Sequence, residues 1–460
     1  MGNAGTRSGR VRAGWVLVAL GAILLAGCQW TLPSYSPDGS RNNTAESTLT
    51  TSNVDGLEME WYATLASEAY TPVAASGLVV TSSGGMLRVF DVGVRDDCSP
   101  LPWRQCAPVW TSAPSAGYLL QPIIVGDKIL VFAGRTALRV YDLDGIEGCS
   151  GTPKVCAPLG EATDATTGEL NVDPSLTVSG STAYVAKDDL RAYPVSSLID
   201  CIVTAAPCAP TWRFVPSGDD YVQMLRVVVA GGTVYASVDR SLDDDTEIVA
   251  IPEGGTGCSG TPVVCSPSWT TQPLTGQEAS AVHLAATGDR LVVSIGPAFD
   301  DPTVNSGGIF AYDVETCSTA PGPCAPLWRS PALRYPSKFA IAEGLVFASD
   351  NDGETTNAFD LAGSTGCAGT PRVCTPVREY EDDVFDDGGP PVVANGILYT
   401  GGDAFDARGV VNCVVSTPNF CTPIRPEHGT GEAIVVNGRV HWIEADGSGP
   451  VYLHTDSIVG

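Results

Sequence analysis

The sequence predicts an all-β protein, an eight-bladed β-propeller with four-stranded antiparallel blades, and three observations support this prediction. A short apolar run, a turn glycine and a second apolar run recur eight times along the 460 residues. Fourteen of the 15 cysteines form close pairs, one pair in each of seven repeats. The 34 prolines and 51 glycines are spread along the chain, and with only 7% aromatic residues and 4 methionines little is left for long amphipathic helices.

The N-terminus predicts export. Residues 1–12 contain three arginines and no acid, and the apolar run 16–25 has the length of a signal-peptide core but not of a membrane span. The run ends in Leu-Ala-Gly-Cys at 25–28, which resembles the lipobox of bacterial lipoproteins. We therefore predict a lipoprotein signal peptide over 1–27 and lipidation of Cys28. The alternative is an ordinary signal peptide that leaves Cys28 as a free exported thiol.

The remaining chain divides into two parts. Residues 28–56 are rich in Ser, Thr, Asn and Pro and predict a lipid-anchored linker, at least in part. Residues 57–460 predict a single propeller domain, in which no stretch reaches 18 consecutive apolar residues. We expect the protein to be tethered by lipid to the outer face of the cytoplasmic membrane, or to the outer membrane if the host has one.

The repeats define the blades. Their turn glycines lie 42 to 56 residues apart, which is room for about four strands. A third strand ends in an aromatic residue that is often followed by Asp, and a fourth strand carries tryptophan in several repeats. Residues 58–63 are expected to supply the missing fourth strand of the last blade, with seven blades as the alternative if the shortest repeat fails to form one. The turn glycines are Gly77, Gly126, Gly180, Gly232, Gly288, Gly344, Gly396 and Gly438, and the tryptophans are Trp110, Trp212, Trp269 and Trp328.

The paired cysteines predict one local disulfide in each of seven blades. The members of a pair flank a turn between the third and fourth strands, where facing positions of antiparallel strands are within reach of a disulfide. Zinc sites use closer cysteine spacings, and the four histidines do not accompany these pairs. Cys28 is left as the odd cysteine, as lipidation would require. The pairs are Cys98 with Cys106, Cys149 with Cys156, Cys201 with Cys208, Cys258 with Cys265, Cys317 with Cys324, Cys367 with Cys374, and Cys413 with Cys421.

The hairpin glycines and the aromatic-Asp pattern resemble the propeller repeats of pyrroloquinoline-quinone (PQQ) dehydrogenases, a group that includes non-enzymatic propeller lipoproteins of bacterial envelopes. The resemblance spans roughly residues 40–456 and includes the entry segment 43–54. In the quinone enzymes, the resemblance implies, PQQ stacks between a tryptophan and a disulfide of adjacent cysteines, above a calcium ion and beside an Asp base. No two cysteines are neighbours in this sequence, and no residues can be assigned to the other roles.

The histidines do not form a recognisable catalytic motif. His283, His428, His441 and His454 lie in the second half of the chain without a G-x-S-x-G elbow. His441 and His454 belong to the last blade and could meet across it in a metal or acid–base role. The alternative is ordinary surface or edge placement.

Several segments are rich in aspartate and could bind calcium through carboxylate oxygens. The pair Asp352-Gly353, however, falls at an expected hairpin turn, where Asp-Gly is favoured. We therefore expect solvated turns and assign no metal ligand. The segments are 243–245, 300–301, 350–354 and 381–387.

The net charge of −27 excludes nucleic acid as an expected partner, because phosphate binding needs clustered Lys and Arg. We predict a non-catalytic propeller, with no cofactor, that serves as a binding or scaffold platform for a protein, peptide or glycan at the cell envelope. The alternative is a PQQ- or calcium-dependent oxidoreductase. A third hypothesis is a purely structural role in envelope assembly.

Overall fold

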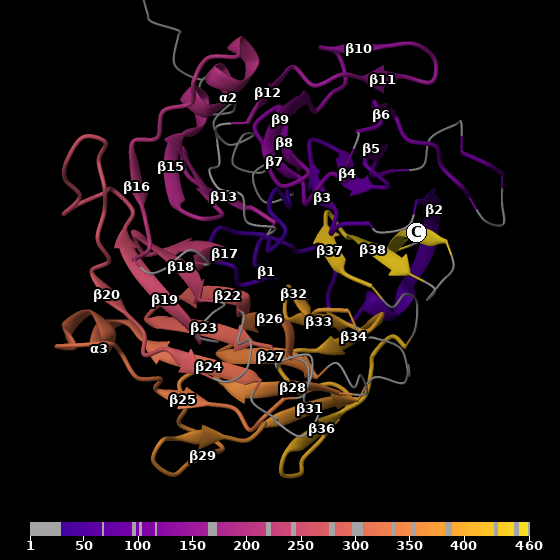
Figure 1. The fold of residues 1–460 in the computed structure, drawn as a ribbon. Helices are drawn as coiled ribbons and strands as arrows, with labels where there is room; N and C mark the ends of the chain where they lie inside the picture. The colour runs from indigo at the N-terminus through magenta and orange to yellow at the C-terminus, as the bar shows by residue number, and fades with distance from the viewer. Residues whose placement is uncertain are drawn as a thin grey trace, which may run out of the picture.

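A computed structural model of the chain shows small antiparallel sheets arranged around a central axis (Figure 1). Its described part contains eight such sheets, which are the predicted eight blades. Among these residues, no helix has the length and apolar character needed to cross a bilayer. The structure describes residues 29–66, 69–93, 98–100, 104–115, 117–163, 173–217, 222–240, 245–275, 281–296, 307–333, 336–350, 355–381, 389–426, 431–445 and 450–458.

The first four blades follow one another along the chain. Blade 1 contains β3 (Val73–Ala75), β4 (Leu78–Ser83), β5 (Met86–Asp91) and β6 (Trp110–Ser112). Blade 2 contains β7 (Ile123–Val125), β8 (Lys128–Ala133), β9 (Ala137–Asp142) and β12 (Gly160–Ala162). Blade 3 contains β13 (Ser175–Ser179), β14 (Thr182–Ala186), β15 (Leu190–Pro194) and β16 (Trp212–Phe214). Blade 4 contains β17 (Val222–Ala230), β18 (Thr233–Arg240), β19 (Asp245–Pro252) and β20 (Trp269–Thr270), with β21 (Leu274–Thr275) also paired to β19.

The remaining blades complete the ring. Blade 5 contains β22 (Ala281–Thr287), β23 (Arg290–Ile295), β24 (Gly308–Asp313) and β25 (Trp328–Arg329). Blade 6 contains β26 (Pro336–Ala342), β27 (Leu345–Asp350), β28 (Thr355–Asp360) and β31 (Arg378–Glu381). Blade 7 contains β32 (Val392–Ala394), β33 (Ile397–Thr400) and β34 (Asp403–Asp406). Blade 8 contains β37 (Ala433–Val436), β38 (Arg439–Ala445), β39 (Val451–Ile458) and β2 (Leu57–Leu65).

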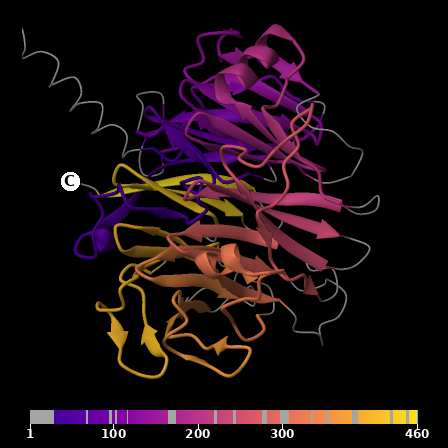
Figure 2. The ribbon, with the colours of Figure 1, turned by 90° about the vertical axis from the view of Figure 1, so that its left-hand side faces the viewer.

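The N-terminal strand closes the ring, as the sequence predicts. Strand β2 pairs antiparallel with β39 from Leu57 opposite Ile458 to Leu65 opposite Val451. Both views show the indigo N-terminal strand beside the yellow C-terminal strands (Figures 1 and 2). The short repeat does form a blade, but its fourth strand is reduced to one bridge between Ala404 and Arg425. On its inner edge this blade gains the parallel strand β1 (Asn42–Asn43).

The hydrophobic core lies between adjacent blades. One buried cluster, for example, combines Val80 and Val89 of blade 1 with Ile129 and Val131 of blade 2. Fourth-strand tryptophans also contact the neighbouring blade at these interfaces. The indole of Trp110, for example, donates a hydrogen bond of 3.0 Å to the carbonyl of Leu143 in the next blade. Equivalent bonds join Trp61 to Val92 and Trp328 to Leu361. The aromatic pattern read from the sequence is therefore the packing surface of each blade against its neighbour.

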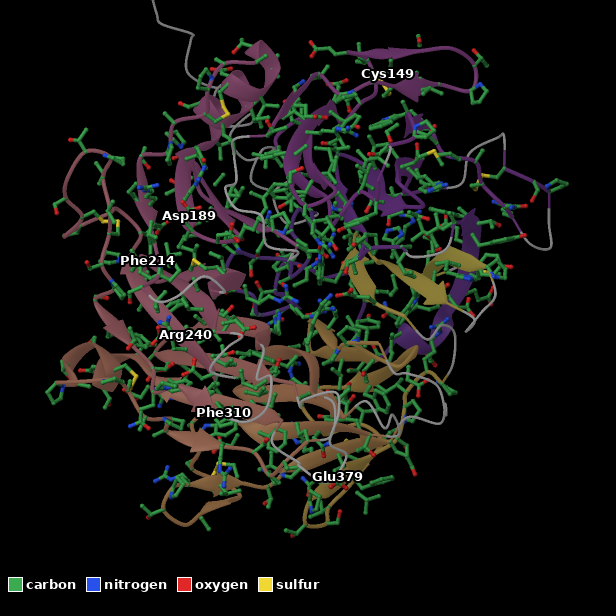
Figure 3. The ribbon with its side chains drawn as sticks, in the orientation of Figure 1. Cys149, Asp189, Phe214, Arg240, Phe310 and Glu379 are labelled. Atoms are coloured by element: carbon green, nitrogen blue, oxygen red, sulfur yellow. A yellow bond between two sulfur atoms is a disulfide. The ribbon has the colours of Figure 1, made fainter. Side chains whose placement is uncertain are left out.

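Seven local disulfides are present, and all seven join the predicted pairs. Cys149 and Cys156 lie directly opposite each other on β10 (Cys149–Ser150) and β11 (Val155–Cys156), at the outer rim (Figure 3). Facing pairs also occur on β29 (Cys367–Ala368) with β30 (Val373–Cys374), and on β35 (Cys413–Val414) with β36 (Asn419–Cys421).

The expected hairpin is wrong in two blades, where the first cysteine lies on a helix. Cys201 is in α2 (Val195–Thr204) and Cys317 is in α3 (Val314–Thr319). In α3 the carboxylate of Asp313 caps the helix by accepting from the backbone N–H of Thr316 at 2.8 Å. The Asp that follows the third-strand aromatic can thus start a helix as well as a turn. The cysteine spacing alone does not distinguish the two conformations.

Each disulfide-bonded connector also covers the outer strand of the preceding blade. Strand β11 of blade 2 pairs in parallel with β6 of blade 1, β30 pairs with β25, and β36 pairs with β31. At three other interfaces, backbone hydrogen bonds of 2.8 to 2.9 Å from cysteine N–H groups join the connector to the preceding blade. At the interface between blades 2 and 3, α2 packs on β12 so closely that a Cβ at Gly160 would lie 2.1 Å from the carbonyl oxygen of Ile202. These cysteine bonds run from Cys106 to Tyr62, from Cys265 to Arg213 and from Cys324 to Thr270. Seven of the eight interfaces between blades are therefore bridged by a disulfide-bonded connector.

Substituting the glycine behind a docked tryptophan tests the packing between blades. A Cβ at Gly145, where φ is +64°, would lie 2.5 Å from Cδ1 of Trp110, whereas Gly126 has a similar φ of +61° and open space around it. We expect Gly126→Ala to lower the free energy of unfolding by about 1–2 kcal/mol through backbone strain alone. Gly145→Ala should cost roughly 1–3 kcal/mol more, because the indole must move. Guanidinium unfolding followed by circular dichroism checks this, and equal losses would contradict the docking contact.

Removing one disulfide tests whether the connectors stabilise the ring. Replacing both Cys149 and Cys156 with Ser should lower the free energy of unfolding by about 2–3 kcal/mol, the chain-entropy estimate for so short a loop. Ser150→Ala, an exposed change on the same hairpin, is the control and should have little effect. The same unfolding measurement applies, and an unchanged midpoint in the double variant would show that this connector stabilises nothing.

Candidate binding site in the central channel

Residues 29–43 line the central channel. Trp30 exchanges backbone hydrogen bonds with Ala74 of blade 1, at 2.7 and 2.8 Å. Successive carbonyls of the segment then accept from the inner strands of blades 2, 4, 5, 6 and 7, near the glycine turns that end those strands. The pairs, at 2.8 to 3.0 Å, are Thr31 with Ile124, Pro37 with Val229, Asp38 with Ala286, Ser40 with Ile341 and Arg41 with Val393. The segment thus forms a floor at the glycine-turn end of the channel.

Part of the segment that composition predicts as a linker packs against the blades: residues 30–43 bond to the inner strands, and Leu49 and Val54 are buried. Composition misleads here because Ser, Pro and Gly suit an irregular buried segment as well as a flexible one. The carboxylate of Asp38 accepts from the backbone N–H of Ser40 at 2.9 Å, which fixes a local turn. Gly39 has a φ of +78°, and a Cβ there would lie 2.3 Å from the carbonyl oxygen of Leu284. Further along, the carboxylate of Glu46 accepts from the backbone N–H of Thr48 and of Gly438.

Above this floor lies a cavity of about 290 Å³, which we call the cup. Its apolar walls come from the segment and from blades 2 to 5, and its polar groups come from the inner strands and the chain just before them. A small cavity with apolar walls and a few convergent polar groups is the usual form of a ligand site. The apolar wall residues are Leu32, Leu120, Phe132, Leu176, Val228 and Leu284, and the polar ones include Tyr70, Gln121, Asp173, Arg226, His283 and Lys338.

Three neighbouring blades direct basic side chains at the cup through β-bulges. The pairing register shifts in β17 between Met224 and Val227, in β22 between Ala281 and His283, and in β26 between Pro336 and Phe339. Arg226 and Lys338 lie within two of these bulges, and His283 borders the third. A bulge interrupts the alternation of a strand and re-aims its side chains. The bulges therefore let charged residues of inner strands reach the channel.

Glu432 is the centre of an ion-pair cluster beside the cup. Its carboxylate accepts from Nη1 of Arg41 at 2.6 Å, from Nζ of Lys338 at 2.9 Å through both oxygens, and from the hydroxyl of Thr71. Burial alone would raise the pKa of Glu432, but the ammonium of Lys338 and the guanidinium of Arg41 lower that pKa to about 2. Lys338 is partly buried, with 35% of its side chain exposed, and this burial lowers its pKa. The cluster connects the floor with blades 1, 6 and 8.

This cluster was not predicted from the sequence, although the repeats contain a signal for it. Thr71, Arg226, Lys338 and Glu432 each stand six residues before a turn glycine, and His283 stands five before one. These equivalent positions meet around one ring in the channel. The corresponding glycines are Gly77, Gly232, Gly344, Gly438 and Gly288.

Of the four histidines considered, only His283 is shown to line the cup. It is buried, its Nε2 donates to the carbonyl of Gly39 at 2.8 Å, and burial together with the nearby Arg41 holds its pKa well below the usual range. His441 lies opposite Thr455 and His454 lies opposite Trp442, so the two histidines are on adjacent rows of the sheet. Side chains of adjacent rows point to opposite faces, and the two histidines therefore do not face each other. Their suggested joint metal or acid–base role is therefore wrong. His428 lies outside the described residues, as does Cys28.

The aspartate-rich segments lie largely outside the described residues. Within the described part of the chain, no group of three or more His, Cys, Asp or Glu side chains is arranged to hold a metal ion. Asp245, which is described, lies 3.9 Å from the guanidinium of Arg240, and Glu381 ends β31. Of the predicted fourth-strand tryptophans, Trp110, Trp212, Trp269 and Trp328 are all buried in the blades.

Comparison with known proteins places the fold but not the function. No model of a known protein family matches the sequence, and no curated protein matches it. The chain is similar to a europium-containing methanol dehydrogenase, with a TM-score of 0.55 and 11% identity over 93% of this chain and 91% of that one. It is also similar to the computationally designed Ika8 protein, with a TM-score of 0.52 and 9% identity over 86% and 100%. BamB from Moraxella catarrhalis aligns with a TM-score of 0.36 and 15% identity over 83% and 82%. The first two likenesses show a shared β-propeller fold.

The lowered pKa of Glu432 predicts a pH-dependent contribution to stability. Because the folded-state pKa of about 2 lies below the ordinary value of 4.5, the stabilisation is present above pH 4.5 and is lost as the pH falls towards 2. Glu432→Gln should therefore cost about 3 kcal/mol at pH 7 and almost nothing near pH 2. Urea unfolding over this pH range measures the difference between the variant and the wild type. Glu161→Gln, at a surface pair with Arg139, is the control with a small effect, and a pH-independent cost of Glu432→Gln would contradict the charge cluster.

Proposed function

We propose that this protein is an exported, lipid-anchored propeller without catalytic activity that binds a protein, peptide or glycan at the cell envelope, with the cup as its binding site. The observation that carries the proposal is the cup itself, with its closed floor and its basic groups presented by bulges on three neighbouring blades. Bulges that re-aim side chains into a cavity are typical of ligand sites.

The titratable groups at the cup favour binding over proton transfer. A general base works best with a pKa near the operating pH. Glu432 has a pKa of about 2 and is engaged by Arg41 and Lys338, while the imidazole of His283 is fixed on the carbonyl of Gly39. These groups hold the blades and the floor together and give the cup a fixed charge. The comparison with a methanol dehydrogenase supports the fold alone.

Tethering through Cys28 would orient the molecule. The segment begins at Gln29 and reaches blade 1 at Trp30, on the glycine-turn side of the channel. Lipid on Cys28 would hold this side towards the membrane and turn the cup away from it. Incorporation of labelled palmitate into the wild type and its loss in Cys28→Ala tests the anchor, and equal labelling of both would contradict it.

Capture from native membranes tests the binding role. We expect the tethered protein to retain a partner that Arg226→Gln releases and that Arg290→Gln, a control at an ion pair with Asp313, retains. Retention of the same partner by Arg226→Gln would show that the cup is not the binding site.

A separate assay tests the catalytic alternative. Purified protein incubated with PQQ and calcium should keep no chromophore and should give no dye-linked oxidation of alcohols. Turnover in this assay would contradict the non-catalytic role and favour the oxidoreductase.

A further inference from the structure

We propose that the outer edge of β35 and the exposed valines around it bind an extended apolar segment of another protein, which adds to the sheet as a further strand. This surface belongs to residues 410–421, which follow the third strand of blade 7 and which we call the valine connector. The valine connector lies at the outer rim, beside the label β36 in Figure 1, and contributes no residue to the cup. The inference therefore goes beyond the binding role proposed above.

Exposed apolar side chains gather on the valine connector. Of the 11 large hydrophobic residues that are exposed in the described part of the chain, four lie within its first six residues. A single exposed apolar residue is ordinary on a protein surface, whereas a group of them marks an interaction surface. The four are Val410, Val411, Val414 and Val415, which are 78, 36, 66 and 91% exposed.

Equivalent positions of other connectors carry no valine. The two residues that follow the first cysteine are Ser-Gly at 150–151, Ser-Gly at 259–260 and Ala-Gly at 368–369, where the valine connector has Val414 and Val415. The three glycines have φ values of +88° to +92°, which disfavour a β-branched residue. The valine connector has one more residue between its cysteines, and Val415 has no positive φ. A disulfide-bonded connector thus forms without these valines, so its fold does not account for them.

The backbone of β35 offers hydrogen bonds to an added strand. β35 is the last strand of its sheet, in the order β26-β27-β28-β31-β36-β35. The Cα atoms of Cys413 and Cys421 lie 4.0 Å apart, which is the short spacing of a pair that exchanges no backbone hydrogen bonds. The N–H and C=O of Cys413 therefore point away from β36, and no described backbone group bonds to them. A segment that pairs with this edge satisfies both groups and lies beside Val414.

The size of the surface suits a short segment better than a second copy of the chain. The four valines expose roughly 400 Å², half of what each partner buries in a stable interface between folded proteins. A segment with apolar residues at alternate positions presents all of them on one face of the added strand, where they can cover the valines. The net charge of −27 makes an uncharged or basic segment a better partner than an acidic one.

Fluorescence anisotropy of the full-length protein with a labelled, uncharged peptide of alternating Val and Thr tests the surface. We expect the peptide to bind and Val414→Lys to weaken binding tenfold or more, because the variant removes apolar contact. Ile146→Lys is the matched control, since Ile146 is 75% exposed on the connector of blade 2, and it should leave binding unchanged. No binding to the wild type, or the same loss in both variants, would overturn the proposal.

Arg226→Gln separates this surface from the cup. The variant should bind the peptide as the wild type does, whatever it does to capture from native membranes. A loss of peptide binding in Arg226→Gln as large as that in Val414→Lys would place the peptide in the cup and overturn the proposal.

Two N-methylated peptides test strand addition. One carries N-methyl groups on the valines and the other on the threonines, so in an added strand one set faces β35 and the other faces away from it. We expect one peptide to bind at least tenfold more weakly than the parent peptide and the other to bind like the parent, because only one loses the edge hydrogen bonds. Equal binding of all three peptides would overturn strand addition.

Sedimentation velocity of the protein without peptide tests the second copy as the occupant. We expect Val414→Lys and the wild type to have the same distribution of oligomeric states. A wild-type dimer that Val414→Lys dissociates would assign the valine connector to self-association and overturn the proposal.

Discussion

The interface between neighbouring blades is the constraint on which the rest of this structure depends. A sheet of four short strands covers neither of its faces alone, so each blade is stable only against the next. Here the contact has two parts: aromatic and aliphatic side chains pack face to face, and a disulfide-bonded connector covers the outer strand of the blade before it. The interface between blades 7 and 8 lacks such a connector in the described chain. It is joined instead by the buried ion pair of Arg425 with Asp456, 2.9 Å, and by the side-chain amide of Asn43, which donates to the carbonyl of Val435 at 2.7 Å.

The ring in turn determines the central site. Inner strands that meet around an axis bring equivalent positions of the repeats together, and bulges in β17, β22 and β26 allow basic residues at those positions. The N-terminal segment then closes one end of the channel and contributes Arg41 to the cluster around Glu432. One stretch of chain forms the floor, contributes Arg41 to the ion-pair cluster and continues into β2, which completes blade 8. The floor, the ion pairs and the closure of the ring therefore depend on one another.

Much of the fold could be predicted from the sequence because it repeats. The turn glycines predicted the hairpins, the cysteine spacings predicted every disulfide, and the missing fourth strand of the last repeat predicted the closing strand at residues 58–63. What could not be predicted depends on long-range contacts. The buried course of residues 29–43 has a linker-like composition, and Gly39 reveals its role only beside Leu284. Cys201 and Cys317 keep the spacing of the other pairs while lying on helices. The cup was missed because Arg226 and Lys338 resemble isolated surface charges until the repeats are aligned on their glycines.

Peptide mapping of unreduced protein tests the central claim most directly, because local bonding of each connector is what lets it cover the neighbouring blade. The account predicts seven disulfides, each joining cysteines seven or eight residues apart in the chain. Sulfurs joined between different repeats, or paired cysteines open to alkylation before reduction, would contradict it.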